Sequence, residues 1–228
     1  MENTLKVTNV LSDPTRYKIY QSFLETKTPK TVADIADLFN IHPNVARLHL
    51  TKLQEIKLLN TYYEKSGKGG RPKRVYILSD HVIELTFPHR DYKMLAEMML
   101  KSLINLGDVG KKALYDTGKA YGEQIMLHHA YEITNMDTKE KFKLLEEKSS
   151  LLGMYPHFSY DENKNSIHFT ITNCPFKEIA EKDSSLICNM HNQFIKGMLH
   201  SVFPDAKLYE KENMFEGCEN CRYVVEIS

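Results

Sequence analysis

A cationic, glycine-centred turn separates two short β-patterned segments in the first third of the chain. The turn, residues 65–74, reads KSGKGGRPKR. The flanking segments, 58–63 and 74–78, are rich in β-branched and aromatic residues, and this arrangement predicts a β-hairpin. The cations of the turn would then project from the hairpin tip.

Three helix-patterned segments precede the hairpin. Asp13 followed by Pro14 is typical of a helix start, Thr31 with Asp34 resembles a capping box, and Pro43 suits the first position of a third helix. Helix, turn, helix and basic hairpin is the order of a winged helix-turn-helix domain. The apolar positions at helical spacing are Tyr17, Ile19, Tyr20, Phe23 and Leu24, then Val32, Ile35, Ala36 and Phe39, then Val45, Leu48, Leu50, Leu53 and Ile56.

The third helix is the one expected to enter the major groove of double-stranded DNA. Its polar and cationic side chains can reach phosphates or base edges, and those of the hairpin can reach the backbone or minor groove. The predicted DNA-binding residues are His42, Asn44, Arg47, His49, Thr51 and Lys52 on the helix, and Lys65, Lys68, Arg71, Lys73 and Arg74 on the hairpin.

The distribution of charge agrees with a polyanionic partner for the N-terminal region. Net charge over the whole chain is zero, but residues 1–90 hold 14 Lys and Arg against 9 Asp and Glu. The N-terminus lacks the basic and apolar regions of a signal peptide, and no apolar run is long enough to span a bilayer. We therefore expect a cytoplasmic protein whose cysteines are reduced.

The rest of the chain predicts a helical region followed by an α+β domain. Pro88 marks a connector, and helices are expected near residues 94–103 and 109–131, where two subunits could pair as a homodimer. Further on, helices at 139–152 and 188–201 alternate with strands at 156–160, 166–172, 207–212 and 222–227. The expected divisions are a winged-helix domain at 1–84, a linker and dimerisation region at 85–135, and a sensor domain at 136–228.

All four cysteines lie in the last quarter of the chain. Four thiolates satisfy either a tetrahedral zinc site or an iron-sulfur cluster, and the number of thiolates does not choose between them. The alternatives are four unrelated buried cysteines, or substitution of one ligand by Glu210 or His191; adjacent His128 and His129 are a weaker pair. The predicted metal ligands are Cys174, Cys188, Cys218 and Cys221.

Two regions resemble known bacterial transcription regulators. The segments ILSDPTRYKIYQSFL, TVADIADLFNIHPNVARLHLTKLQEIKLLN and GRPKRVYILS resemble the winged-helix domain of ArsR and DeoR type regulators, in particular the subgroup with the repressor of iron-sulfur assembly operons. NCPFKEIAEKDSSLICNMH and GCENCRYVVEI are similar to the C-terminal region of that subgroup and to vinyl-reductase-type sensor domains that use zinc. The sequence departs from both patterns, with Asn213 where a cysteine is common and Cys218 after Gly217.

These observations predict a DNA-binding regulator whose metal occupancy modulates operator binding. The alternative is a zinc-stabilised regulator with a small-molecule effector pocket lined by Phe158, Tyr160, Phe169 and Phe194. A dithiol redox enzyme is disfavoured because Cys218 and Cys221 precede a strand rather than open a helix. We expect no enzymatic activity.

Overall fold

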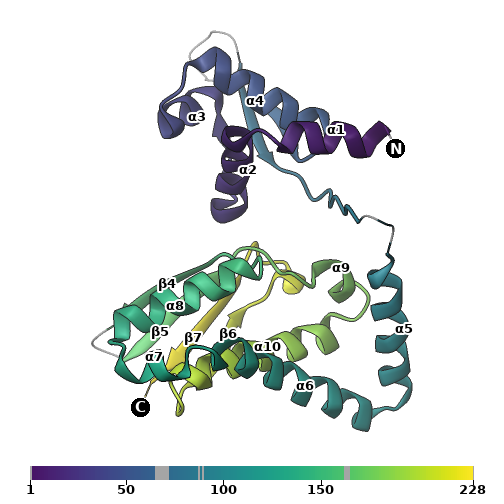
Figure 1. Cartoon of the computed structure of the whole chain (residues 1–228), viewed down its shortest axis with the longest axis vertical. Coiled ribbons are helices and arrows are strands. Elements are labelled where there is room, and N and C mark those ends of the chain that lie inside the picture. The colour runs from purple at the N-terminus through teal and green to yellow at the C-terminus, as the bar shows by residue number, and fades with distance from the viewer. Residues whose placement is uncertain (1, 65–71, 87, 89, 162–164, 228) are drawn as a thin grey trace. The chain divides into compact units, whose positions relative to one another are not determined.

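The chain divides into two compact units, Met1–His89 and Arg90–Ser228. The computed structural model describes residues 2–64, 72–86, 88, 90–161 and 165–227 (Figure 1). The helices expected in a separate linker at 85–135 belong to the second unit, so the division falls near residue 90.

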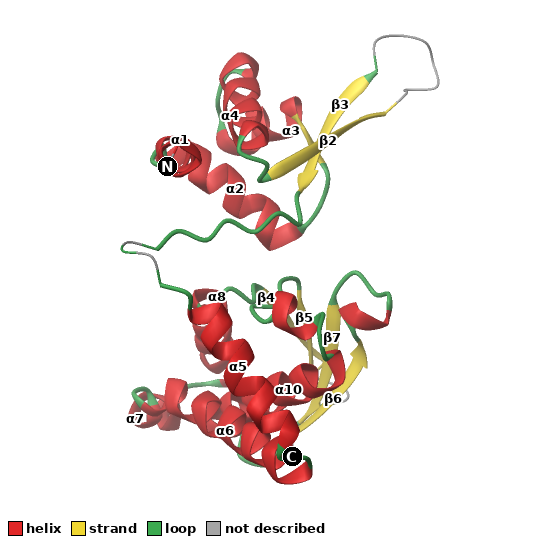
Figure 2. Cartoon of the chain, turned by 90° about the vertical axis from the view of Figure 1, so that its right-hand side faces the viewer, coloured by secondary structure: helices red, strands yellow, loops and turns green. Residues whose placement is uncertain are grey.

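The first unit combines helices with a small antiparallel sheet. Its helices are α1 (Glu2–Leu11), α2 (Pro14–Thr26), α3 (Val32–Phe39) and α4 (Pro43–Glu55). The strands β1 (Lys30–Thr31), β2 (Leu59–Glu64) and β3 (Lys73–Leu78) pair in the order β1-β3-β2. The predicted hairpin is confirmed as β2 and β3, which extend to one side of the helices (Figure 2). Helix α1 was not predicted.

The helix starts that the sequence predicted are confirmed. The Asp13 carboxylate accepts a hydrogen bond from the Arg16 backbone N–H at 2.9 Å, at the start of α2. Thr31 and Asp34 form a reciprocal capping box at the start of α3. These caps satisfy backbone N–H groups that a helix leaves unpaired at its first turn.

One face of α4 belongs to the core of the first unit. The residues on this buried face differ from those that the sequence predicted. Ala46, Leu50 and Leu53 are fully buried, whereas Val45 and Leu48 are 41% and 54% exposed. The prediction that Val45 and Leu48 face the core is therefore wrong. Positions 46, 49, 50 and 53 recur at helical spacing, and this stripe packs against the other helices.

The second unit is the expected α+β domain. Its antiparallel sheet has the strand order β4-β5-β7-β6, formed by β4 (Pro156–Asp161), β5 (Ser166–Ile171), β6 (Lys207–Glu212) and β7 (Cys221–Glu226). Side chains of α8 (Thr138–Leu151) and α10 (Ser184–Val202) share one apolar core with β5 and β7. The remaining helices are α5 (Tyr92–Asn105), α6 (Asp108–Leu127), α7 (Ala130–Asn135) and α9 (Lys177–Ala180), with a 3-10 turn at Met214–Glu216.

Two helix boundaries differ from the sequence prediction. The helical pattern expected from 109 to 131 is broken near His128, where α6 ends and α7 follows. Helix α10 begins at Ser184 rather than Cys188, because the Asp183 carboxylate caps it by accepting from the Leu186 N–H at 3.0 Å. Within the described ranges, no helix is long and apolar enough to span a membrane.

Glycines allow α6 and α10 to lie side by side at very close range (Figure 1). A Cβ atom added to Gly122 would lie 2.0 Å from the Phe194 carbonyl oxygen. A Cβ atom on Gly197 would lie 2.1 Å from the Lys119 carbonyl oxygen. The missing side chains therefore let the two backbones touch, and α6 holds α10 against the sheet.

Replacing Gly122 by Ala should destabilise the second unit by about 1 to 3 kcal/mol, because the backbones must separate. An alanine in an ordinary helix position would instead stabilise by up to about 1 kcal/mol. Gly118→Ala is the matched comparison, since its Cβ would meet the Met190 carbonyl oxygen at 2.9 Å and should cost less. Urea unfolding followed by circular dichroism measures both. A Gly122→Ala protein as stable as the wild type would contradict this packing.

Candidate nucleic-acid interface and thiol cluster

The solvent-facing side of α4 carries four of the six residues of the helix region that were predicted to contact DNA. Asn44 and Arg47 are exposed, and Thr51 and Lys52 are half-buried on the same side. The Lys52 ammonium forms an exposed ion pair with Glu55 at 3.0 Å, which water and salt weaken. His42 is exposed and is the N-cap, where its Nδ1 accepts from the Asn44 backbone N–H at 3.2 Å.

His49 does not belong to this face, and the prediction that it contacts DNA is wrong. Only 7% of the residue is exposed, and Nδ1 lies 4.0 Å from a carboxylate oxygen of Asp13. Burial lowers the pKa of His49, and the Asp13 carboxylate only partly opposes this effect. The side chain is therefore packed inside the first unit, close to the N-terminus of α2, and does not face solvent.

Two apolar side chains stand on the face instead. Val45 and Leu48, which the sequence pattern assigned to the core, are exposed beside Asn44 and Arg47. Exposed methyl groups on a helix that enters the major groove can contact the methyl group of thymine. Sequence alone does not identify these residues, because an apolar residue on a helix is usually expected to face the core. The orientation of α4 in the fold shows that they are exposed.

The described part of the hairpin carries one exposed cation and one half-buried cation. Lys73 is exposed at the start of β3. Arg74 is half-buried; its Nη2 donates to the Gln54 Oε1 at 2.5 Å, and the guanidinium lies 5.2 Å from the centre of the Tyr76 ring. Arg74 therefore joins the hairpin to α4, and its contact with DNA stays a prediction. Lys65, Lys68 and Arg71 lie outside the described residues.

Three of the four cysteines converge in the second unit. Cys174 follows β5, Cys188 lies in the second turn of α10, and Cys221 begins β7 opposite Ile171 of β5. Cys174 and Cys221 are each 8% exposed. Burial raises the pKa of Cys174 to about 11, with smaller contributions from the Cys221 and Cys188 charges. The pKa values of Cys188 and Cys221 are also raised, mainly by burial, so all three thiols are neutral near pH 7.

Cys218 is separate from this group. It is half-buried and follows Gly217, whose φ of +90° permits the tight turn before β7. The charges of Cys188 and Cys221 both contribute to raising the pKa of Cys174, which places these three thiols near one another. No group of three or more His, Cys, Asp or Glu side chains stands at metal-binding spacing in the parts of the chain that the structure describes. The four cysteines are therefore not arranged as one tetrahedral set.

A carboxylate and two amides lie beside the thiols. Glu210 accepts hydrogen bonds from Asn192 Nδ2 at 2.6 Å and from the Asn213 amide. The Tyr223 hydroxyl donates to Asn192 Oδ1 at 3.0 Å. The charge of Glu210 contributes to raising the pKa values of both Cys188 and Cys221, which places it near these thiols. Side chains from β6, α10 and β7 thus form one polar network around two of the cysteines.

His191 is the buried neighbour of the third thiol. Its Nδ1 lies 3.9 Å from Cys174 Sγ, its Nε2 lies 3.2 Å from the Met154 sulfur, and the Phe176 ring meets it edge to face. Burial lowers the pKa of His191 to about 4, so the ring is neutral at pH 7. A neutral imidazole next to a thiol is a chemically competent metal ligand.

The aromatic residues expected to line an effector pocket are mostly packed as core. Phe158 and Phe169 stack with ring centres 5.0 Å apart. The cavity that they help to line holds about 20 Å³, room for roughly one water molecule. Tyr160 and Phe194 do not line it. A small organic effector would therefore have to displace core side chains to enter.

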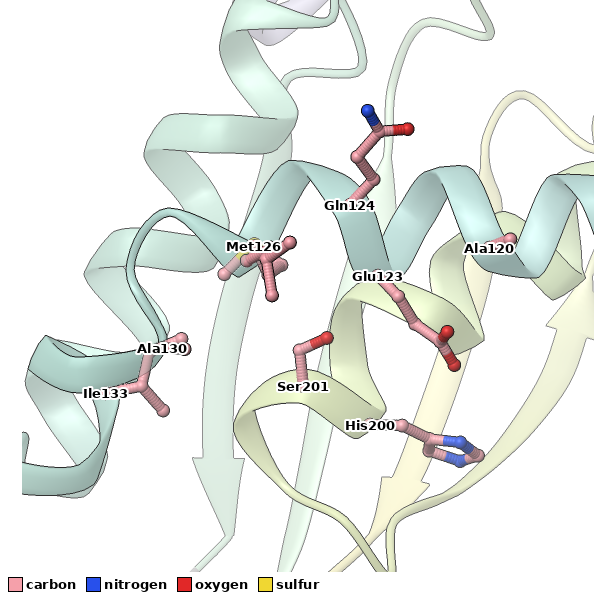
Figure 3. Close-up of a pocket in the computed structure, with 9 residues that line it drawn as sticks. Ala120, Glu123, Gln124, Met126, Ala130, Ile133, His200 and Ser201 are labelled. Atoms are coloured by element: carbon pink, nitrogen blue, oxygen red, sulfur yellow. The ribbon is translucent and has the colours of Figure 1, made fainter.

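A larger hollow lies at the surface between α6, α7 and the end of α10 (Figure 3). It has a volume of about 550 Å³ and is lined by Glu123, Met126, Ile133, His200 and Ser201, among others. His200 Nε2 lies 3.0 Å from the Ala206 carbonyl oxygen, so the ring also ties the end of α10 to the following loop. This hollow contains none of the cysteines.

Comparison with known proteins agrees with the two-unit division. A family model described as a helix-turn-helix domain matches residues 11–62, which span α2 to β2. The chain carries an N-terminal helix-turn-helix domain. A model described as methanogen output domain 1 matches residues 124–226, from the end of α6 through β7. The thiol cluster lies inside this second matched region.

One curated relative matches the N-terminal part. It is an uncharacterized HTH-type transcriptional regulator, YdfF, of Bacillus subtilis (strain 168), 37% identical over 78 residues. The match covers 34% of this chain, and the chain spans about a third of the relative's length, 31%.

Among solved structures, the phenol-responsive sensory domain of the transcription activator PoxR with phenol is 14% identical, covering 79% of this chain and 89% of that one with a TM-score of 0.42. An H-NOX protein from S. oneidensis is 12% identical, covering 66% and 81%, with a TM-score of 0.41. At these values neither likeness defines the fold or the function of this chain.

The buried His191 should make the second unit less stable in mild acid. Its pKa in the fold is below its unfolded value, so its contribution is present above about pH 6.5 and is lost as the pH falls toward 4. Between pH 7 and 5 the loss should be about 2 kcal/mol. Urea titrations of His191→Gln should show a flatter pH dependence, whereas His128→Gln, at an exposed position, should keep the wild-type slope. Equal slopes for His191→Gln and wild type would contradict the assignment.

Proposed function

We propose that the chain is a transcription regulator whose N-terminal unit binds double-stranded DNA through the exposed face of α4. The observation that carries the proposal is this face, which presents Asn44, Arg47, Leu48, Thr51 and Lys52 outward within a matched helix-turn-helix domain. The YdfF match, limited to the N-terminal part, supports the same class of protein.

The residues divide into those that position the helix and those that read sequence. Arg47 and Lys52 neutralise phosphates and give affinity for any duplex. Asn44 can pair with adenine, and the Val45 and Leu48 methyl groups can contact thymine, so these three give sequence preference. Lys73 adds a backbone contact from the hairpin. His49 acts indirectly as part of the buried stripe of α4, and Arg74 acts indirectly by joining the hairpin to Gln54 of α4.

Replacing Arg47 by Ala should weaken binding to all duplexes by about 1 kcal/mol or more and reduce the slope of log K against log salt by about 0.9. Fluorescence anisotropy with a labelled duplex selected from a random library, and with a scrambled duplex, measures both quantities. Arg222→Ala is the matched control, because it removes the same charge from an exposed ion pair of the second unit. Unchanged affinity and slope for Arg47→Ala would contradict the proposal, as would a wild-type protein that binds no duplex.

We also propose that the thiol cluster binds a metal, either zinc or an iron-sulfur cluster. Cys174, Cys188 and Cys221 come from three separate segments; Cys174 and Cys221 are buried, Cys188 is half-buried, and the pKa of each thiol is raised. A bound metal cation would favour the thiolate forms of these cysteines, because its positive charge would stabilise their negative charges. The donor chemistry therefore fits a metal, although the thiols must approach one another to reach binding distance.

The identity of the fourth ligand would distinguish a zinc site from an iron-sulfur cluster. Glu210 or His191 with three thiolates gives a set that zinc accepts, whereas an iron-sulfur cluster with four cysteine ligands needs Cys218 as well. Glu210 is already held near Cys188 and Cys221 by two amides, which favours zinc. Metal occupancy would draw α10, β6 and β7 together, and we propose that this change modulates operator binding by a homodimer.

Cys188→Ser should remove the bound metal and lower the melting temperature of the metal-loaded protein, because the metal binds the folded state. Elemental analysis and visible absorption of anaerobically purified protein measure the loss and identify the metal. Cys218→Ser and Glu210→Gln then decide the fourth ligand: zinc retained in Cys218→Ser but lost in Glu210→Gln supports the carboxylate. Full metal content in Cys188→Ser would exclude the site.

A further inference from the structure

The surface hollow between α6, α7 and the end of α10 is large enough for a small organic molecule. Its volume of about 550 Å³ lies within the range of about 300 to 1,000 Å³ that is typical of ligand sites. Neither the proposed DNA-binding face nor the thiol cluster uses the residues that line it. We call it the α6–α10 hollow, and its lining includes Glu123, Met126, Ala130, Ile133, His200 and Ser201.

The α6–α10 hollow has a polar end and an apolar end (Figure 3). The Glu123 carboxylate and the His200 ring lie at one end. The side chains of Met126, Ala130 and Ile133 lie at the other. Met126 and Ile133 are buried, so the apolar wall is part of the ordered core. A ligand that fills the hollow therefore needs a polar group at one end and an apolar body at the other.

The neutral polar side chains of the hollow offer hydrogen-bond acceptors, because their own hydrogens are bonded within the protein. The Ser201 hydroxyl donates to the Gly197 carbonyl oxygen at 3.0 Å, so its oxygen can accept from a ligand. His200 Nε2 donates to the Ala206 carbonyl oxygen at 3.0 Å, so Nδ1 of the neutral ring is an acceptor. The Gln124 amide is directed away from both groups (Figure 3). The polar group of the ligand must therefore supply the hydrogens.

The charge of the α6–α10 hollow favours a cation. With His200 neutral, Glu123 carries the formal charge among the described residues that line the hollow, and its side chain is about half exposed. Lys119 lies 3.7 Å from this carboxylate in an exposed pair, which contributes little. The carboxylate would repel an anion, and one carboxylate with one imidazole is fewer than the three protein ligands of a typical zinc site. An ammonium group matches both the charge and the acceptors, because it carries three donors.

We propose that the α6–α10 hollow binds a small organic amine in its ammonium form. The ammonium group pairs with Glu123 and donates to His200 and Ser201, and an aliphatic or aromatic body packs against Met126 and Ile133. The assignment rests on the hollow alone and does not require DNA or a metal.

A bound amine would contact both of the helices that the glycines hold together. Glu123 follows Gly122 in α6, and its backbone nitrogen would lie 2.9 Å from a Cβ atom added to Gly197. Ser201 lies one turn after Gly197 in α10. A ligand that bridges Glu123 and Ser201 therefore favours the packed arrangement of α6 and α10 and stabilises the second unit. Any effect on operator binding rests on the proposed function, because α10 also carries Cys188 of the thiol cluster.

A nuclear magnetic resonance titration of the full chain without DNA tests the proposal, with phenethylamine as the probe. Phenethylammonium should bind with a dissociation constant of about 1 mM or lower. The carboxylate 3-phenylpropionate, of similar size, should bind at least about 10-fold more weakly. Glu123→Gln should weaken phenethylammonium binding by at least about 10-fold and leave the affinity for the neutral isostere 2-phenylethanol unchanged. Glu147→Gln removes the same charge from an exposed pair of α8 and, as the matched control, should bind like the wild type.

The methyl signals of Ile133 and Met126 locate the bound probe. Both side chains line the hollow, so their signals should shift during the titration. Ile167 and Met154 are equally buried elsewhere in the same unit and should not shift. A circular dichroism spectrum equal to that of the wild type shows that Glu123→Gln is folded.

Four results would each overturn the proposal. They are tighter binding of 3-phenylpropionate than of phenethylammonium, unchanged phenethylammonium affinity in Glu123→Gln, shifts at Ile167 and Met154 without shifts at Ile133 and Met126, and no phenethylammonium binding at about 10 mM. A protein that binds phenethylammonium in the hollow but binds no duplex would defeat the proposed function and leave this assignment intact.

Discussion

The packing of one stripe of α4 against the core is the constraint from which the proposed interface follows. Ala46, His49, Leu50 and Leu53 are buried together, so the helix cannot rotate without exposing them. This fixes Asn44, Arg47 and Leu48 on the outside. The proposed DNA-binding face is therefore a consequence of what the core excludes, and His49 belongs to the buried stripe, with its Nδ1 4.0 Å from an Asp13 carboxylate oxygen.

In the second unit, α10 both packs in the core and carries residues of the thiol cluster and its polar network. Its backbone touches α6 at Gly197, its apolar face shares the core of the sheet, and Cys188, His191 and Asn192 lie along it. Residues from β6 and β7 complete the polar network around the thiols. A metal that pulled these thiols together would act directly on α10, and through the close glycine contact on α6.

The helix starts could be predicted from residues close together in the sequence. The burial of single side chains and the grouping of the cysteines could not, because they depend on long-range packing. Asp13, Thr31 and Pro43 marked helix starts because capping depends on residues within one turn. The burial of His49 was not predictable because it depends on the tertiary packing of α4, which brings the ring near Asp13, 36 positions away in the sequence. The Cys-x-x-Cys spacing likewise suggested that Cys218 and Cys221 act together, but only the fold shows Cys221 beside Cys174 and Cys188.

Methyl nuclear magnetic resonance of the full chain, titrated with a duplex selected from a random library, tests the central claim most directly. The Val45 and Leu48 methyl groups are exposed on α4, whereas those of Leu50 and Leu53 are buried in the same helix. We predict large shifts and contacts to DNA protons for Val45 and Leu48, and only small shifts for Leu50 and Leu53. A bound duplex that leaves the Val45 and Leu48 signals unchanged would contradict the account.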